Sequence, residues 1–394
     1  MLYKEIKNDV FYIGLNDADR VIFDELIPLE HGTTYNSYLI KGSEKTAIID
    51  TMYPPFSDLY IKNFEANGIK NVDYIIANHG EQDHSGSIPA LIEKFPNAIV
   101  ITNEKCKQNI MEMLLVPENR IKTIQDKEEL SLGDKTLQFI LAPGVHWPDT
   151  MFTYLKEDNM LFTCDFLGAH LPFEDLYSKN DDLLYSMAKR YYAEIMMPFR
   201  LMCKKYLNLI DEIKPSYILP SHGPLYKEPE FILNAYKDWT DDKPKNLVLI
   251  PYVSMYGSTE EMVEYVKKGL EKEGINVYTH DIVRDDLGDL AVQLVDAATI
   301  VVGASMVLAG PHPMAINACI LANALKPKTK FATVIGSYGW GGKLAETIAS
   351  LFTSIKPEFI KPVIIKGKLK NEGYIELDEL IKTITEKHKS IGLM

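Results

Sequence analysis

One heptapeptide carries the densest set of metal-ligand side chains in the sequence. It reads Asn78-His79-Gly80-Glu81-Gln82-Asp83-His84 and follows the apolar run 74–77. Because alternate residues of extended backbone share one side, we expect His79, Glu81 and Asp83 to converge and His84 to point elsewhere. Imidazole and carboxylate groups at a strand end indicate a metal site, whereas polar loops also hold such residues without a metal.

Three more ligand-type residues lie where apolar, strand-like segments meet loops. They are His146, Asp165 and His222, in Pro143-Gly144-Val145-His146-Trp147, Phe162-Thr163-Cys164-Asp165 and Pro220-Ser221-His222-Gly223. Each one alone is more typical of a turn, but a scaffold aims strand-end side chains into one cleft, so together they indicate a site. The set holds no thiolate, and its oxygen and imidazole donors favour iron or manganese over a soft metal site.

This order of residues resembles the metallo-β-lactamase fold, whose hydrolytic members bind zinc through H-x-H-x-D-H. Here Glu81 stands at the second histidine, and the pattern is similar to the di-iron domain of the flavodiiron proteins, also called A-type flavoproteins. The resemblance covers the whole chain in domain order and motifs. It implies an N-terminal metallo-β-lactamase-like αββα sandwich with two non-haem iron ions.

The resemblance also implies a role for each ligand. His79, Glu81 and His146 would hold one iron, Asp83 and His222 the other, and Asp165 would bridge them. His84 matches a position that ligates in some family members and turns away in others, so its role stays open. The segments 32–39 and 146–151 resemble family segments that line the pocket. His31, Tyr191 and Tyr192 are candidates for hydrogen bonds near the metals, while His170, His280 and His388 are interpreted as structural or surface residues.

The chain divides near a short charged stretch with a proline, 240–245, which is typical of a linker. We therefore expect two domains, residues 1–243 and 247–394. The first mixes short strands, at 10–13, 35–40, 46–50, 136–142, 151–154, 160–163 and 217–220, with helices. The second alternates strands, at 247–253, 275–282, 299–303, 331–336 and 362–365, with helical patterns, which predicts a doubly wound α/β domain with a five-stranded parallel sheet.

Three loops of the second domain are candidates for binding a cofactor. Ser254-Met255-Tyr256-Gly257-Ser258-Thr259 opens a helix, where backbone N–H groups and hydroxyls suit a phosphate, and Ser or Thr there are also ordinary helix caps. The others are Ala304-Ser305-Met306 and Ser337-Tyr338-Gly339-Trp340-Gly341-Gly342. A flavodoxin-like strand order brings these loops to one crevice, where Tyr338 and Trp340 can stack on a flat ring. The loops resemble flavodoxin and imply FMN, although Ala304-Ser305-Met306 departs from the Ser-Pro-Thr-type segment of many flavodiiron proteins.

Composition excludes several classes of protein. The chain has 394 residues with 46% hydrophobic and 25% charged residues and a net charge of −13, which disfavours general binding to nucleic acid or anionic membrane. No apolar run is long enough for a membrane helix, and the N-terminus lacks a secretory pattern, so we expect a cytoplasmic location. The four cysteines form no C-x-x-C pair, which indicates inert thiols.

The resemblance implies an oxidoreductase in which FMN accepts electrons and two irons reduce O2 to water or NO to N2O. It also implies a head-to-tail homodimer, or a dimer of dimers, in which each flavin faces its partner's irons. No cysteine pair follows the second domain, so we expect a separate electron donor such as rubredoxin or a reduced cofactor system. Two alternatives stay open: a zinc-dependent metallo-β-lactamase-type hydrolase fused to a flavodoxin-like module, and a non-enzymatic electron carrier.

Overall fold

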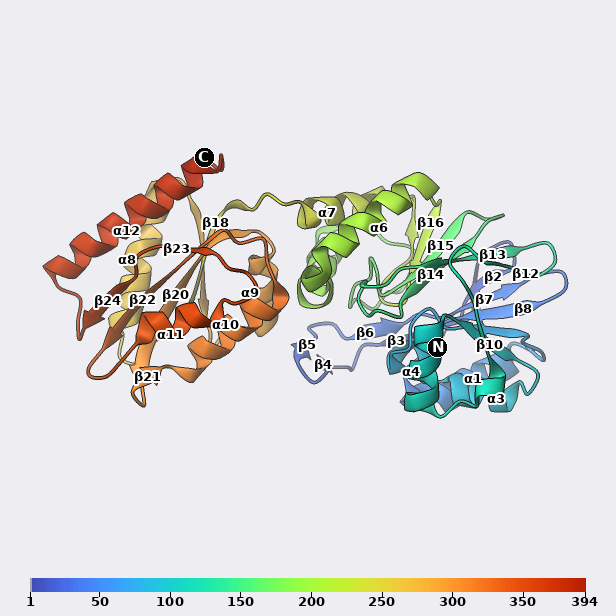
Figure 1. The fold of residues 1–394 in the computed structure, drawn as a ribbon. Coiled ribbons are helices and arrows are strands. Elements are labelled where there is room, and N and C mark those ends of the chain that lie inside the picture. The colour runs from blue at the N-terminus through green and yellow to red at the C-terminus, as the bar shows by residue number, and fades with distance from the viewer. Residues whose placement is uncertain (1) are drawn as a thin grey trace. The chain divides into compact units, whose positions relative to one another are not determined.

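The chain folds into two units, Met1–Thr240 and Asp241–Met394. The computed structural model describes residues 2–394, and each unit is considered by itself. Each predicted strand has a counterpart in the structure, with ends shifted by a few residues, and further short strands join them (Figure 1). Tyr217–Pro220 is observed with the predicted bounds.

The first unit is a sandwich of two sheets. One sheet has the order β1 (Lys4–Lys7), β2 (Val10–Tyr12), β7 (Tyr38–Lys41), β8 (Thr46–Ile49), β9 (Tyr74–Ile76), β10 (Ile99–Thr102), β11 (Ile121–Thr123). The other has the order β12 (Glu129–Ser131), β13 (Thr136–Leu141), β14 (Met151–Leu155), β15 (Met160–Cys164), β16 (Tyr217–Pro220), β17 (Tyr226–Lys227). Side chains alternate between the faces of each strand, so β8 sends Ala47 and Ile49 into the core between the sheets and Ile48 outward.

Helices cover the outer faces of both sheets, which gives the predicted αββα arrangement. They are α1 (Ser57–Ala66), α3 (Ile88–Lys94), α4 (Glu104–Leu114), α5 (Asp182–Tyr191), α6 (Arg200–Ile213) and α7 (Glu230–Thr240), while the short α2 (Gln82–Ser85) follows the end of β9. The core around Ile48 includes Tyr60 of α1 and Ile110 of α4. On the other side Phe152 of β14 packs edge-on against Tyr206 of α6. Two short ribbons, β3 (Leu15–Asp17) with β6 (Thr33–Tyr35) and β4 (Ile22–Phe23) with β5 (Ile27–Pro28), complete the unit.

The predicted strand 35–40 is two strands. The chain leaves β6 at Tyr35 and enters β7 at Tyr38. Between them the backbone N–H of Asn36 donates to the carbonyl of Ser221, and its side chain donates to the carbonyls of Pro220 and Gly223, each at 2.8 Å. These bonds to the loop after β16 replace strand pairing, which is why the strand is interrupted there.

The second unit has the flavodoxin strand order 2-1-3-4-5. Its parallel sheet runs β19 (Asn276–Asp281), β18 (Lys245–Tyr252), β20 (Ala297–Val307), β22 (Phe331–Tyr338), and then β23 (Glu358–Phe359) and β24 (Val363–Lys366), with β21 (Gly310–Pro311) paired to β20. The helices are α8 (Ser258–Lys272), α9 (Leu287–Leu294), α10 (Pro313–Leu325), α11 (Leu344–Leu351) and α12 (Asn371–Ser390). Helices α8 and α12 pack together on one face of the sheet, and α9 and α10 contact β18 (Figure 1).

Candidate metal centre and flavin pocket

The seven predicted ligand residues come from the ends of four strands. His79 and Glu81 follow β9, and Asp83 and His84 lie in the short helix α2 after them. The other three, His146, Asp165 and His222, follow β13, β15 and β16, whose carboxyl ends lie at one edge of their sheet because β13, β15 and β16 run in the same direction. The structure brings all seven together.

One group consists of His79, Glu81, His146 and Asp165, whose ligand atoms all lie within 4.8 Å of one another. Glu81 Oε2 is 3.1 Å from His79 Nε2 and 3.3 Å from His146 Nε2. Asp165 Oδ2 is 3.5 Å from His146 Nε2 and 3.8 Å from His79 Nε2. Two carboxylates therefore share one space with two imidazole nitrogens, a donor set suited to one cation.

A second group consists of Asp83, His84 and His222. The two oxygens of Asp83 are 3.3 Å from His84 Nε2 and 3.1 Å from His222 Nε2. The remaining oxygen of Asp165, Oδ1, is 2.9 Å from His84 Nε2 and 3.5 Å from His222 Nε2. Asp165 thus turns one oxygen to each group, as a carboxylate that bridges two cations must.

The expectation from extended backbone is wrong for Asp83 and His84. The chain turns into α2 at Gln82, where Ser85 Oγ donates to the carbonyls of Gly80 and Glu81. In that helical turn His84 lies beside Asp83 instead of pointing away, so both belong to the second group.

Several ligand atoms lack hydrogen bonds although they are buried. The two Asp83 oxygens, His84 Nε2 and His222 Nε2 have no hydrogen-bond partner, and all face the same space. Buried polar atoms are almost always satisfied, so a cluster of unsatisfied ones facing each other fits the binding of a cation. The donor set therefore suits the di-iron centre that the sequence predicts.

The imidazole and carboxylate groups of the centre shift one another's pKa values. Burial lowers the pKa of His222, but the nearby carboxylates of Asp165 and Asp83 outweigh burial and raise the pKa to about 10. Burial raises the pKa of Asp165, but His84, His146 and His222 together hold it well below its usual range. Burial also raises the pKa of the Cys164 thiol, which favours the neutral form over a thiolate ligand.

The neighbouring polar residues divide into those at the centre and those away from it. Tyr191 donates a hydrogen bond of 2.9 Å to Asp165 Oδ1, whereas the Tyr192 hydroxyl donates to the carbonyl of Trp239. His31 is largely exposed and lies beside Glu30. His170, interpreted from the sequence as structural or surface, is buried with its ring centroid 5.1 Å from that of His222. The carboxylate of Asp149, a residue with no separate predicted role, lies 3.1 Å from His79 Nδ1.

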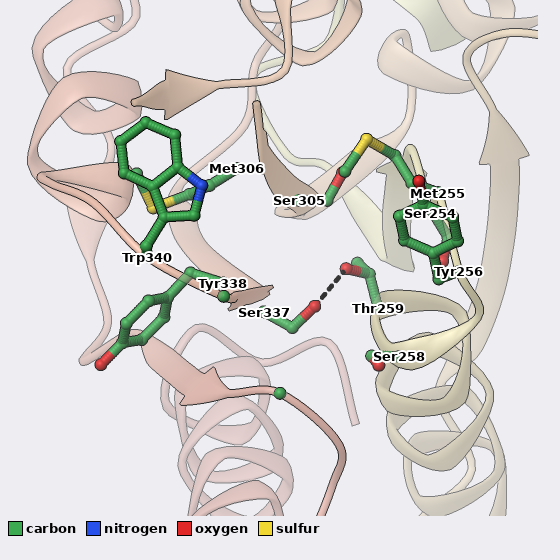
Figure 2. A pocket seen from close by; sticks show the side chains of 12 residues that line it. Ser254, Met255, Tyr256, Ser258, Thr259, Ser305, Met306, Ser337, Tyr338 and Trp340 are labelled. Atoms are coloured by element: carbon green, nitrogen blue, oxygen red, sulfur yellow. Dashed lines mark hydrogen bonds between the residues drawn. The ribbon is translucent and has the colours of Figure 1, made fainter. Parts of the chain in front are cut away.

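A cavity of about 330 Å³ opens at the carboxyl edge of the second unit's sheet. Its lining is Ser254, Met255, Tyr256, Ser258, Thr259, Ser305, Met306, Ser337, Tyr338, Gly339, Trp340 and Gly367. Figure 2 shows Tyr338 and Trp340 on one wall, Met255 and Tyr256 on the opposite wall, and a hydrogen bond of 3.3 Å between Thr259 and Ser337. The three predicted loops therefore meet at one cavity, as a flavodoxin-like order requires.

Four residues named for this site do not line the cavity: Gly257, Ala304, Gly341 and Gly342. Ala304 is fully buried because β20 continues to Val307 and pairs with β22, Ser305 opposite Ser337, where the sequence suggested a loop. Gly367 lines the cavity and had no sequence signal beyond following a strand. Ser305 Oγ is buried without a hydrogen-bond partner at the cavity, which fits a polar ligand atom.

The fold and the two sites define a class: a metallo-β-lactamase-like sandwich joined to a flavodoxin-like unit. A family model described as an ODP family beta lactamase matches residues 33–223. A nitric oxide reductase of Moorella thermoacetica is 32% identical over 90% of this chain and 90% of its own length. A flavo-diiron protein of Clostridium acetobutylicum is 31% identical over 89% of this chain and 91% of its own.

The solved structures agree with these sequence comparisons. Rubredoxin oxygen:oxidoreductase from Desulfovibrio gigas aligns over 99% of both chains with a TM-score of 0.94 and 25% identity. This chain belongs to the flavodiiron protein family. Within residues 2–394, no helix has both the length and the apolar character needed to cross a membrane.

Proposed function

We propose that this chain is a flavodiiron oxidoreductase that reduces O2 to water, NO to N2O, or both. The observation that carries the proposal is Asp165, whose two oxygens face two separate sets of histidine and carboxylate ligands. The names of the relatives support it, since one is a nitric oxide reductase and another a rubredoxin oxygen:oxidoreductase. Bound iron would supply electrons and Lewis acidity at this site, and FMN would collect electrons from the donor.

The ligand roles that we propose follow the two groups. His79, Glu81 and His146 would hold one iron, Asp83, His84 and His222 would hold the other, and Asp165 would offer one oxygen to each. Oxygen and imidazole donors without a thiolate suit iron. Tyr191 holds the bridging carboxylate through its hydroxyl. Because the ligands already lie together, little rearrangement of this pocket is needed when the metals bind.

The residues of the second unit have separate tasks toward FMN. Ser254, Ser258 and Thr259, at the start of α8, offer hydroxyls and helix N–H groups to the phosphate. Tyr338 and Trp340 offer faces for the flat ring, with Ser305 supplying a polar atom at the same cavity. We therefore propose FMN, whose phosphate the residues before and at the start of α8 would hold and whose ring the other two loops would contact.

The rims of both sites fit a head-to-tail dimer, which we propose as the working assembly. At the flavin cavity Tyr256 is 92% exposed and Trp340 71% exposed, large apolar surfaces that a covering protein would bury. On the first unit the β4–β5 ribbon leaves Val21 and Leu26 exposed. In a head-to-tail dimer, the exposed Tyr256 and Trp340 of one copy would pack against the β4–β5 ribbon of the other, and both surfaces would be buried. Sedimentation of the holoprotein tests this. A fully active monomer would contradict the dimer.

The test of the function combines metal analysis with rapid mixing. We expect about two iron ions and one FMN per chain, and fast oxidation of the fully reduced protein by O2, NO or both. The electron donor is external, rubredoxin or a reduced cofactor system, and each is tried as the reductant. Zinc in place of iron would favour the hydrolase alternative, and reduced protein that both gases leave unchanged would favour an electron carrier.

A further inference from the structure

We propose that Asp149 is a positioning residue whose carboxylate fixes the ring orientation and tautomer of His79, and so makes the two metal positions unequal. The inference rests on the proposed function, because it requires His79 to hold a metal. It concerns a residue that does not itself reach the metal space: Asp149 contacts the far nitrogen of a ligand ring.

The His79 ring lies between Asp149 and the centre. Its Nδ1 is 3.1 Å from Asp149 Oδ1, and its Nε2 is 3.1 Å from Glu81 Oε2 and 3.8 Å from Asp165 Oδ2. The side chains of His79 and Asp149 are both fully buried. Because a carboxylate only accepts hydrogen bonds, Nδ1 must carry the proton, which leaves the Nε2 lone pair for a metal.

Asp149 is itself held in place from three directions. The backbone N–H of Gly80 donates to Oδ2 at 2.9 Å, and Asn109 Nδ2 donates to the same oxygen at 3.0 Å. Asn103 Nδ2 donates to the Asp149 carbonyl at 2.6 Å. Asn103 caps α4 and Asn109 lies within it, so one helix sets the position of the carboxylate. Among the ion pairs described for residues 2–394, that of Asp149 is with His79 alone.

Gly80 makes room for this arrangement. A Cβ on Gly80 would lie 2.9 Å from Asp149 Oδ2 and 2.8 Å from the Cβ of Asn109. Such contacts are shorter than packed atoms accept, so a side chain at this position would push the carboxylate away from His79. The glycine between two ligand residues is therefore part of the support of His79.

The second metal position is supported differently. His222 Nδ1 lies 2.6 Å from the backbone carbonyl of Thr34, a neutral acceptor. A buried carboxylate raises the basicity of the imidazole it contacts more than a carbonyl does. The metal held by His79 should thus be the more electron-rich of the two, and harder to reduce.

Asp149→Asn separates this role from simple packing, because it keeps the shape and removes the charge. If the new NH2 group faces His79, Nδ1 must accept, and the proton moves to Nε2, where it blocks the metal. If the amide is reversed, the NH2 group meets the donors of Gly80 and Asn109. Neither orientation reproduces the native contacts.

The experiment loads full-length wild type, Asp149→Asn and the control Asp158→Asn, a buried carboxylate paired with Lys135 outside the two ligand groups, with Fe(II) without oxygen. Iron retention against a chelator and the stepwise reduction of the iron pair, followed by EPR, are measured. We expect Asp149→Asn to lose one of its two irons about 10- to 100-fold faster. We also expect one reduction step to shift to higher potential. The control keeps the His79 contact and should retain both irons.

Unchanged retention and unchanged potentials in Asp149→Asn would overturn the inference. Wild type that binds no iron would instead contradict the proposed function. Circular dichroism of the metal-free protein shows whether the variant folds. If it does not fold, an NMR measurement on the wild type still tests the proposal. In Zn(II)-loaded protein with ¹⁵N-labelled histidine, NMR should find His79 bound through Nε2 with Nδ1 protonated, and metal on Nδ1 would refute the proposal.

Discussion

The metal centre and the flavin pocket differ in the charge and the burial of the side chains that form them. The centre gathers ionised side chains, buried and mutually paired, before any metal binds. The pocket relies on hydroxyls, helix N–H groups and aromatic rings, of which Tyr256 and Trp340 are largely exposed. Burying charges is costly unless they are paired. The stability of the first unit should therefore depend on bound metal and on the protonation states of the ligand residues. The second unit should remain folded without its ligand.

The largest expected effect comes from Asp165→Asn. The amide cannot bridge two cations, and it leaves His84, His146 and His222 without their shared carboxylate. Supporting contacts alone are worth about 10- to 100-fold, so losing this ligand should lower turnover more than ~100-fold. Iron content should fall while FMN content stays unchanged.

The matched control for that variant is Asp158→Asn. Asp158 is equally buried in the same unit, but it pairs with Lys135 away from the metals. It should lose stability and keep its iron. Loss of iron in both variants would mean that general destabilisation, not ligation, explains the first result.

Removing the iron should make the stability of the first unit depend on pH in the alkaline range. Burial lowers the pKa of His146, but contacts with Asp165 and Glu81 outweigh it and raise the pKa to about 9, and His222 reaches about 10. These values exceed the ~6.5 of an unfolded histidine. The stabilisation is therefore complete below about pH 6.5 and is lost as the pH rises through 9 to 10.

We expect the unfolding free energy of the metal-free protein to fall by several kcal/mol between pH 7 and pH 10, and its melting temperature to fall with it. Differential scanning calorimetry of metal-free and iron-loaded samples measures this. Iron displaces the protons, so the loaded sample should not follow the same titration. Parallel curves for the two samples would show that the histidines do not govern the difference.

Trp340→Ala should weaken FMN binding and leave the iron untouched. The loss of one aromatic face is worth about 0.5–1.5 kcal/mol, up to roughly tenfold in affinity. Fluorescence titration of the flavin-free protein measures the change. Ile375→Ala, an exposed apolar residue on α12 of the same unit, is the control and should bind FMN normally.

The smallest expected effect is that of Gly257→Ala. Gly257 has φ +85° at the start of α8, and an added Cβ would meet nothing within 4 Å, so only backbone strain opposes the change. The loop of the flavin-free variant can relieve that strain by leaving this conformation, so FMN binding must restore about 1 kcal/mol of strain and the affinity should fall roughly fivefold. Gly274 has φ +81° and equally open space at the far end of α8. Gly274→Ala should lose similar stability without losing FMN affinity.

The sequence predicted which residues lie at the strand ends better than the local turn that places His84. Apolar runs ending in His or Asp identified the strands and the residues at their ends, because strand patterns and residue chemistry are local properties. The grouping of His84 with Asp83 depends on the single turn of α2, which Ser85 stabilises by bonding back to Gly80 and Glu81. Four residues are too few to show a helical period, so extended backbone was the natural but wrong expectation.

The ends of the strands before two of the cofactor loops were predicted too early, for a related reason. Gly303 and Gly336 suggested strand ends, yet β20 and β22 continue to Val307 and Tyr338 because each supplies the other's hydrogen-bond partners. Pairing between distant segments cannot be read from either segment alone. No specific role was predicted for Asp149, because the sequence does not show that its side chain contacts His79, 70 positions earlier.

A π-helical turn, Tyr192–Met196, directly follows α5. Such turns accommodate one residue more than regular helix, and each residue rotates a side chain by about 100° around the axis. Tyr191, the last residue of α5, bonds to Asp165, while Tyr192, the first residue of the π-helical turn, bonds to Trp239 in a separate aromatic cluster. The number of residues in this helical segment therefore determines which side chain faces Asp165 and which faces the aromatic cluster. Deleting one residue of the turn would rotate the side chains on one side of the deletion by about 100° relative to those on the other. Tyr191 and Tyr192 could then no longer contact Asp165 and Trp239 at the same time.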